Sequence, residues 1–337
     1  MKVAKYTFYF IFMVTITFFI CELVCRINGL KPYEDYVNTS EVEPKLCADM
    51  DSVFGYSLLP GYFTFLDNDT VICHATHNND CRRITSNNSQ DIQKLDKVIF
   101  IGCSFTYGDG LEDTCTHPYI LQQLFNNAKI NLHVENWGVG GYGAALFFLQ
   151  AKEVIRDTSV KFVVINYGSF QDQRTACSRS LRKSLSPNIN ERQYAWRTRF
   201  PYFAFDYKGD LILKHKPLSY QLLPFQKKLA LVELMDNLYC KFENRNCTSM
   251  TKSALEIIID ILQKKGIKVI LSGISGDSQT IELVENFKTK GYTTLLYGFN
   301  SPEYTMPDGH PNFKANRIFA DSLYSKITSI LSVNNQN

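Results

Sequence analysis

The sequence lacks several of the features that would define its function directly. It contains no C-x-x-C motif, which argues against a thiol-dependent redox protein. It also lacks the Walker lysine, so its glycine-rich loops do not predict a site for nucleotide phosphates. The net charge of +3 is spread without a dense basic stripe, and we therefore expect no binding to nucleic acid.

Ten cysteines are present, but their spacing matches no strong metal-binding pattern. Cys73, His74, His77 and Cys81 have the chemistry of ligands without the spacing of a zinc site. We therefore expect no metal here, and the chemistry predicted below requires no organic cofactor. Two pairs that are close in sequence, Cys73 with Cys81 and Cys240 with Cys247, are instead predicted to close short disulfide loops, which persist in an oxidising compartment.

The N-terminal segment contains the one long apolar run. Residues 6–25 are about one membrane thickness of helix, and Lys2 and Lys5 before them favour a cytoplasmic N-terminus. No small-residue cleavage pattern follows the run, so an uncleaved anchor is favoured over a signal peptide. Either alternative places the remainder of the chain on the periplasmic or extracellular side.

Beyond the anchor the pattern of the sequence divides into two parts. Residues 28–96 are polar and predict a stalk or a small accessory β segment. From residue 97 to 337, short apolar runs such as KVIFIG (97–102) and VKFVVINYG (160–168) alternate with helical segments, which predicts an α/β fold with a parallel five-stranded sheet covered on both faces. An aromatic insertion is expected at about 173–250.

Unusual residues follow three of these segments. The first group is GCSFTYGDG (102–110), in which Ser104 follows a strand and opens a helix, a suitable place for a nucleophile, although a serine that only caps the helix is the commoner case. The second is NWGVGGYG (136–143), whose glycines allow close backbone approach to a ligand. The third is PDGHPN (307–312), where one loop supplies both a histidine base and a carboxylate to orient it.

Together these three segments resemble the blocks of the SGNH hydrolases, also called GDSL-type esterases and lipases. The resemblance covers about residues 97–330 and implies a flavodoxin-like three-layer α/β/α sandwich. It implies that Ser104 is the nucleophile, His310 the base and Asp308 its partner, with the backbone N–H groups of Ser104 and Gly141 in the oxyanion hole.

The chain departs from the pattern of this family at three places. Cys103 replaces the acid before the serine and is expected to be a small buried residue rather than the nucleophile. Asp308 is one residue closer to the histidine than usual. The family's GxND block is absent, and INYGSFQDQR (165–174) offers Gln171, or alternatively Asn166, as the side-chain donor of the oxyanion hole.

The resulting hypothesis is a membrane-anchored serine esterase that acts on an acylated small molecule or glycan, for example on O-acetyl groups of envelope glycans. An acyltransferase and a non-catalytic glycan-binding member of the same fold are the alternatives. The aromatic segment 192–207 would suit sugar stacking, a lid or a packed cap.

Overall fold

A computed structural model describes residues 2–35, 39–87, 95–190, 199–299 and 301–334. Its central element is a five-stranded sheet with the strand order β12-β11-β8-β6-β7, in which every neighbouring pair is parallel. The strands are β6 (Asp96–Ile101), β7 (Leu132–Asn136), β8 (Val160–Tyr167), β11 (Lys268–Gly273) and β12 (Thr294–Leu296). This order is the flavodoxin-like one, so the predicted fold class is confirmed.

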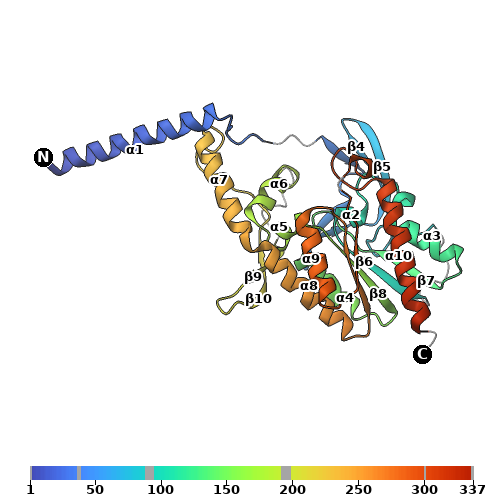
Figure 1. Cartoon of the computed structure of the whole chain (residues 1–337). Coiled ribbons are helices and arrows are strands. Elements are labelled where there is room, and N and C mark those ends of the chain that lie inside the picture. Colours follow the sequence, from blue (N-terminus) through green and yellow to red (C-terminus); the bar gives the residue numbers. More distant parts are fainter. Residues whose placement is uncertain (1, 36–38, 88–94, 191–198, 300, 335–337) are drawn as a thin grey trace.

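Helices cover both faces of the sheet (Figure 1). They are α3 (His117–Asn127) and α10 (Phe313–Asn334) on one face, and α4 (Ala144–Val154), α8 (Cys247–Gln263) and α9 (Ser278–Thr289) on the other. Successive residues of β6 point to opposite faces, because side chains alternate along a strand. Val98 and Phe100 thus pack with α3 and α10, whereas Ile99 and Ile101 belong to the larger core beneath α4 and α8.

The accessory segment before the sheet is built from short antiparallel strands. They are β1 (Ser40–Glu43), β2 (Ala48–Asp51), β3 (Gly55–Leu58), β4 (Gly61–Asp67) and β5 (Thr70–His77). Arg83, which follows β5, is almost fully buried and donates to the carbonyl oxygens of Tyr107, Gly108 and Leu111. Its guanidinium therefore joins the accessory segment to the loop that follows the first strand of the sheet.

The expected insertion at 173–250 contains regular structure. It comprises α5 (Asp172–Thr175), α6 (Arg179–Asn190), the hairpin of β9 (Phe200–Phe205) and β10 (Leu211–Lys216), and α7 (Ala230–Glu243). Phe200 and Phe203 of the hairpin are buried in the main core. These two rings therefore serve as a packed cap and are not available for stacking on a sugar. Residues 191–198 of the aromatic segment lie outside the described residues.

The predicted disulfide loops are not formed, because Cys73, Cys81, Cys240 and Cys247 are free thiols in the structure. The side chain of Cys73 is buried within β5, whereas Cys81 lies in the turn that follows. Cys240 is on α7, whereas Cys247 begins α8 and packs with Ala176 and Met250. In each pair the two cysteines belong to different structural elements, so their closeness in sequence does not bring the two sulfur atoms together.

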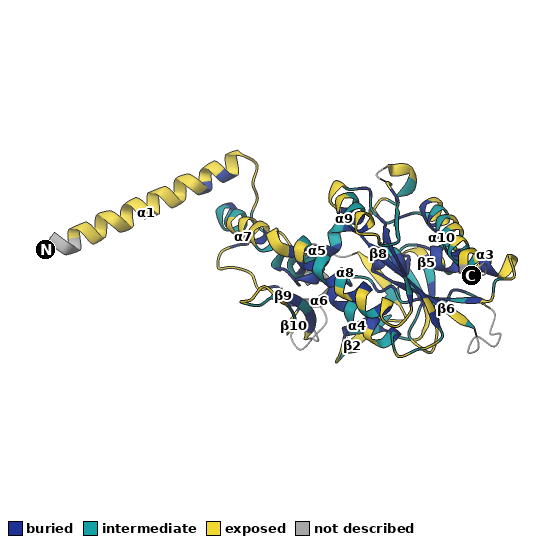
Figure 2. Cartoon of the chain, turned by 60° about the horizontal axis from the view of Figure 1, so that its bottom comes forward, coloured by how far each residue is buried: buried dark blue, intermediate teal, exposed yellow. Residues whose placement is uncertain are grey.

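The N-terminal helix α1 (Lys2–Ile27) extends away from the rest of the chain (Figure 1). Its segment Lys5–Ile27 is long and apolar enough to cross a membrane, and most of its residues are exposed (Figure 2). The last turns of α1 contact the domain, where Glu22 and Cys25 are buried and α1 packs on α7.

Candidate active site

Ser104 lies at the carboxyl end of β6, next to the point where the chain order of the sheet reverses. In open α/β sheets ligands bind in this crevice. The serine begins the short helix α2 (Ser104–Tyr107) and its side chain is nearly buried. Gly102 allows the tight turn, because a Cβ atom there would lie 1.9 Å from the hydroxyl oxygen of Thr106.

A buried polar network holds α2 from below. Asn166 of β8 donates to the Thr106 hydroxyl at 2.9 Å, and its amide nitrogen lies 2.9 Å from Nε2 of His117. The other ring nitrogen of His117 lies 2.8 Å from Oδ1 of Asn316 on α10, an acceptor, so Nδ1 carries the proton and Nε2 accepts. Burial lowers the pKa of His117 to about 4, and the imidazole is therefore neutral at physiological pH.

The glycine-rich loop after β7 passes close to Ser104. A methyl group built on Gly140 would lie 4.0 Å from Cβ of Ser104. Gly141 has a φ of +82°, and a Cβ atom there would lie 2.4 Å from the Tyr56 hydroxyl oxygen. A side chain at position 141 is thus disfavoured both by the backbone conformation and by the space available.

His310 and Asp308 are joined within one loop. The carboxylate of Asp308 lies 3.0 Å from Nδ1 of His310 and also accepts the backbone N–H of His310 at 3.0 Å. The base of the loop is closed by a bridge between Thr305 and Pro311. The imidazole ring lies 5.2 Å from the ring of Phe105, the residue after Ser104. The closer spacing of the aspartate and histidine therefore still permits the contact between their side chains.

Asp109 was not singled out from the sequence, although it belongs to the GCSFTYGDG segment. Its Oδ2 atom lies 3.7 Å from Nε2 of His310 and close to Gly140. The imidazole thus has a carboxylate beside each of its nitrogens. Surrounding protein atoms raise the pKa of Asp109, and this effect is opposed by the nearby His310. The one feature of the sequence that pointed to Asp109 was its position in the GCSFTYGDG segment, five residues after Ser104.

The two candidate side-chain donors of the oxyanion hole differ in their partners. Both described contacts of the Asn166 amide nitrogen belong to the buried network beneath α2. Gln171 is also fully buried, and its amide nitrogen lies 3.0 Å from Sγ of Cys103 and 3.3 Å from the carbonyl oxygen of Asn166. Sulfur is a weak acceptor, so the Gln171 amide loses less free energy than the Asn166 amide would if it left this partner to bind an oxyanion.

Cys103 lies directly beside Ser104 and is fully buried. Its sulfur is 4.0 Å from the Ser104 hydroxyl oxygen and accepts a hydrogen bond from the side-chain amide of Gln171. The neighbouring Asp172 binds the hydroxyl groups of Tyr167 and Thr248 and so fastens the loop after β8 to α8. Gln171 is therefore held between two fixed neighbours.

A small apolar cavity of about 190 Å³ adjoins these residues. Phe105 and Gly309, the neighbours of Ser104 and His310, contribute to its wall. Phe299, Tyr304 and Phe319 also line it. Its composition suits a short hydrocarbon chain. No group of three or more potential metal-ligating side chains occurs within the part of the chain that the structure describes.

The sequence matches no protein-family profile and no curated protein. The structure is similar to a psychrotrophic esterase from Pseudoalteromonas, with 11% identity, a TM-score of 0.41, and coverage of 70% of this chain and 99% of the esterase. An acetyl xylan esterase has 13% identity, a TM-score of 0.39, and coverage of 68% and 99%, respectively. A GDSL-like lipase from Bacteroides thetaiotaomicron has 15% identity, a TM-score of 0.36, and coverage of 72% and 94%. The identities and TM-scores are low, so the assignment of the site rests on the geometry of its residues.

Proposed function

We propose that the chain is a serine ester hydrolase in which Ser104 attacks the ester carbonyl and His310 accepts its proton. The observation that carries this proposal is the pairing of Asp308 with Nδ1 of His310. The ring of this histidine contacts the ring of Phe105, the residue next to Ser104. A carboxylate at Nδ1 leaves Nε2 as the basic nitrogen and stabilises the imidazolium that forms. An isolated helix-capping serine would need no such arrangement.

The proposed reaction requires the imidazole of His310 to turn. Nε2 of His310 rests near Asp109 and must turn toward the Ser104 hydroxyl, an adjustment that substrate binding commonly brings about. The Ser104 oxygen then bonds to the carbonyl carbon, and the leaving alcohol departs with the proton from His310. Water, deprotonated by His310, hydrolyses the acyl-enzyme and releases the acid. The N–H groups of Ser104 and Gly141 and the amide of Gln171 would bind the oxyanion.

The proposed substrate is an ester of a short acyl group, such as an O-acetyl group on an envelope glycan. The apolar cavity beside Phe105 supports a small acyl group by its volume of about 190 Å³. The proposed location of the domain outside the cytoplasm supports a glycan as the alcohol. Transfer to an acceptor hydroxyl instead of water would use the same residues.

Active-site labelling tests the hydrolase proposal. A fluorophosphonate should label the wild-type chain, and peptide mapping should find the label on Ser104. Ser104→Ala should lose the label and all turnover of a short-chain aryl ester, whereas Cys103→Ala should retain both. Labelling that follows Cys103 instead would refute the assignment, and a wild-type chain that neither labels nor turns over would favour the non-catalytic glycan-binding alternative.

We further propose that α1 is an uncleaved membrane anchor with the catalytic domain outside the cytoplasm. The carboxylate of Glu22 accepts the backbone N–H groups of Ala230 and Leu231, the first residues of α7, and the side chain of Arg26 donates to the carbonyl oxygen of Lys228. Four N–H groups at the start of a helix need external partners. Cleavage of α1 near residue 26 would remove the Glu22 cap, so this contact supports retention of the helix.

The anchor can be tested in the source membrane. The mature protein should retain its first residues by intact mass, stay in the membrane after a carbonate wash and be digested by protease added from outside. A soluble mature form that begins near residue 26 would refute the anchor but not the export. Protection of the domain from external protease would refute the export.

A further inference from the structure

We propose that the outer face of α7 docks onto the bilayer beside α1, so that the domain touches the membrane at a second place. This inference rests on the proposed anchor. The occupant of the face is the interfacial region of the lipid bilayer, and the surface consists of four side chains of α7, which we call the apolar stripe: Met235, Leu238, Tyr239 and Phe242.

The apolar stripe follows the helix repeat on the side that faces solvent. Its members are spaced at i, i+3, i+4 and i+7, so they lie on one face of the helix. Each of them is more than half exposed: 58% for Met235, 55% for Leu238, 54% for Tyr239 and 63% for Phe242. A contiguous exposed apolar face of this kind marks an interaction surface, whereas single exposed apolar residues do not.

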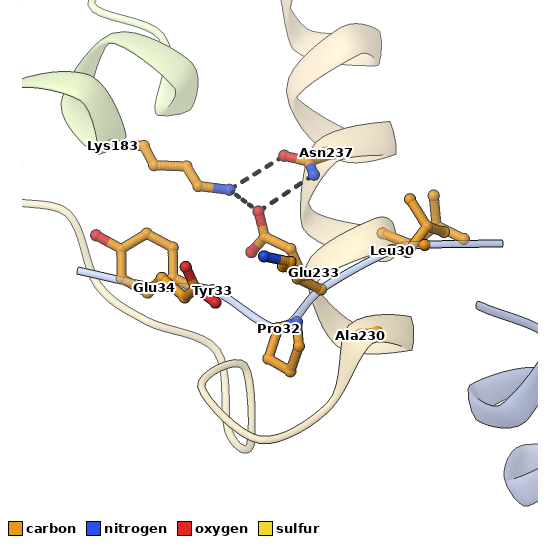
Figure 3. A pocket seen from close by; sticks show the side chains of 11 residues that line it. Leu30, Pro32, Tyr33, Glu34, Lys183, Ala230, Glu233 and Asn237 are labelled. Atoms are coloured by element: carbon orange, nitrogen blue, oxygen red, sulfur yellow. Dashed lines mark hydrogen bonds and ion pairs between the residues drawn. The ribbon is translucent and has the colours of Figure 1, made fainter. Parts of the chain in front are cut away.

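Another face of α7 packs on the domain. Asp236 is buried there and accepts bonds from Lys183, Arg179 and the hydroxyl of Tyr220. Lys183 also binds Glu233 and Asn237, which line a cavity of about 410 Å³ between α7 and the segment after α1 (Figure 3). Rotation of α7 to bury the apolar stripe would break these ion pairs, so the exposure of the stripe is fixed by the fold.

The position of α7 at the end of α1 identifies the bilayer as the occupant. Glu22 and Arg26, in the last turns of the candidate spanning helix, bind the start of α7. The segment after α1 is fastened to the same region, because the N–H of Tyr33 donates to Gln226 and Asp35 pairs with Lys227. A helix held at the end of a spanning helix by these contacts begins at the membrane surface.

The composition around the apolar stripe also fits a lipid interface. Phe225, in the loop before α7, is 67% exposed, and Leu222 and Leu223 beside it are exposed as well. Exposed cations flank the stripe at Lys228, Lys241 and Arg245. Interfacial helices combine aromatic and aliphatic side chains on one face with flanking lysine and arginine that bind anionic headgroups. A soluble partner protein would not explain the location at the anchor.

Depth-dependent quenching tests this proposal in the full chain. Phe242→Trp places a reporter in the apolar stripe, and Ile257→Trp places one at a partly exposed apolar position of α8, as a matched control. Both variants are reconstituted in vesicles of phosphatidylcholine with a minor fraction of phosphatidylglycerol, with lipids brominated near the headgroup. Trp137 and Trp196 of the native sequence emit in every variant, so each spectrum is taken as the difference from the parent chain. In these difference spectra we expect the tryptophan at 242 to be quenched and blue-shifted, whereas the one at 257 keeps its emission. Met235→Trp gives a second, independent reading.

Several outcomes would overturn the proposal. Equal emission of both variants with and without brominated lipid would place the stripe in water. A blue shift at position 242 that appears only at a high ratio of protein to lipid, together with cross-linked dimers, would identify a second copy of the chain as the occupant. Intact mass of the reconstituted chain shows whether α1 is present, so a missing anchor is distinguished from a stripe that does not dock.

Discussion

Tyr56 donates a 2.6 Å hydrogen bond to the carbonyl oxygen of Gly140, although 84 residues separate the two. Tyr56 belongs to the accessory β segment, and Gly140 to the glycine-rich loop beside Ser104. The ring of Tyr56 is fixed by the rings of Phe200 and Tyr142, at 6.0 and 5.3 Å. The accessory segment therefore helps to shape the loop that would hold the oxyanion.

Tyr56→Phe removes this hydrogen bond and keeps the ring in place. We expect kcat for a short aryl ester to fall roughly five-fold, in line with about 1 kcal/mol for one hydrogen bond, with little change in KM. Tyr62→Phe, at an exposed position of β4, is the matched control and should leave both constants unchanged. An unaltered kcat in Tyr56→Phe would show that the loop keeps its shape without the bond.

Asp308→Asn tests the orientation of the histidine. The amide is neutral and cannot stabilise the imidazolium at Nδ1, so we expect kcat to fall by about two to four orders of magnitude. Asp321→Asn, an exposed change on α10, should have no effect. If Asp109→Asn abolishes turnover while Asp308→Asn does not, then the carboxylate beside Nε2 has the catalytic role instead.

Gln171→Ala and Asn166→Ala separate an oxyanion donor from a structural amide. If Gln171 binds the oxyanion, its replacement should lower kcat by about 100- to 1,000-fold. Asn166→Ala should chiefly lower stability, by about 1–3 kcal/mol, because Thr106 and His117 lose a buried partner. Steady-state kinetics and urea unfolding on both variants measure the two effects. The reverse pattern would assign the donor to Asn166.

If the cavity beside Phe105 binds the acyl group, its walls should set the chain-length preference. Phe299→Ala removes part of its apolar wall, so we expect the ratio of kcat/KM for octanoyl to that for acetyl aryl esters to rise several-fold. Ile257→Ala, at a partly exposed position of α8, serves as the control. If the ratio is unchanged in Phe299→Ala, the acyl group binds elsewhere.

Two buried histidines predict a loss of stability in mild acid. Burial lowers the pKa of both His77 and His117 to about 4, whereas an unfolded histidine titrates near 6.5. Between these values the unfolded chain binds protons that the folded chain does not. The free energy of unfolding should therefore decline as pH falls from about 6.5 toward 4, by roughly 2 kcal/mol per histidine at pH 5.

Urea unfolding of the detergent-solubilised chain at about pH 7.5 and pH 5 measures this loss. His117→Gln should show a smaller decline between the two pH values than the wild type, because one of the titrating groups is absent. His215→Gln, at an exposed position, should keep the wild-type decline. An identical decline in His117→Gln would remove His117 from the explanation.

The sequence by itself predicted the parallel sheet, because each central strand is a short apolar run that must be buried on both faces. It also placed Asp308 beside His310, since two residues of one short loop need no tertiary contact to meet. The strand before Ser104 and the helix that begins with it were enough to predict that this serine lies at the carboxyl end of a sheet strand.

The tertiary structure decided the relationships between distant segments. Nothing in the local pattern places Tyr56 against Gly140, Asp109 beside Nε2 of His310, or Glu22 at the start of α7. The same is true of the cysteine pairs, whose closeness in sequence was misleading, and of α7, where periodicity cannot tell which face the domain buries. Local pattern fixes the direction of a side chain relative to its own backbone, but its partner depends on how whole elements pack.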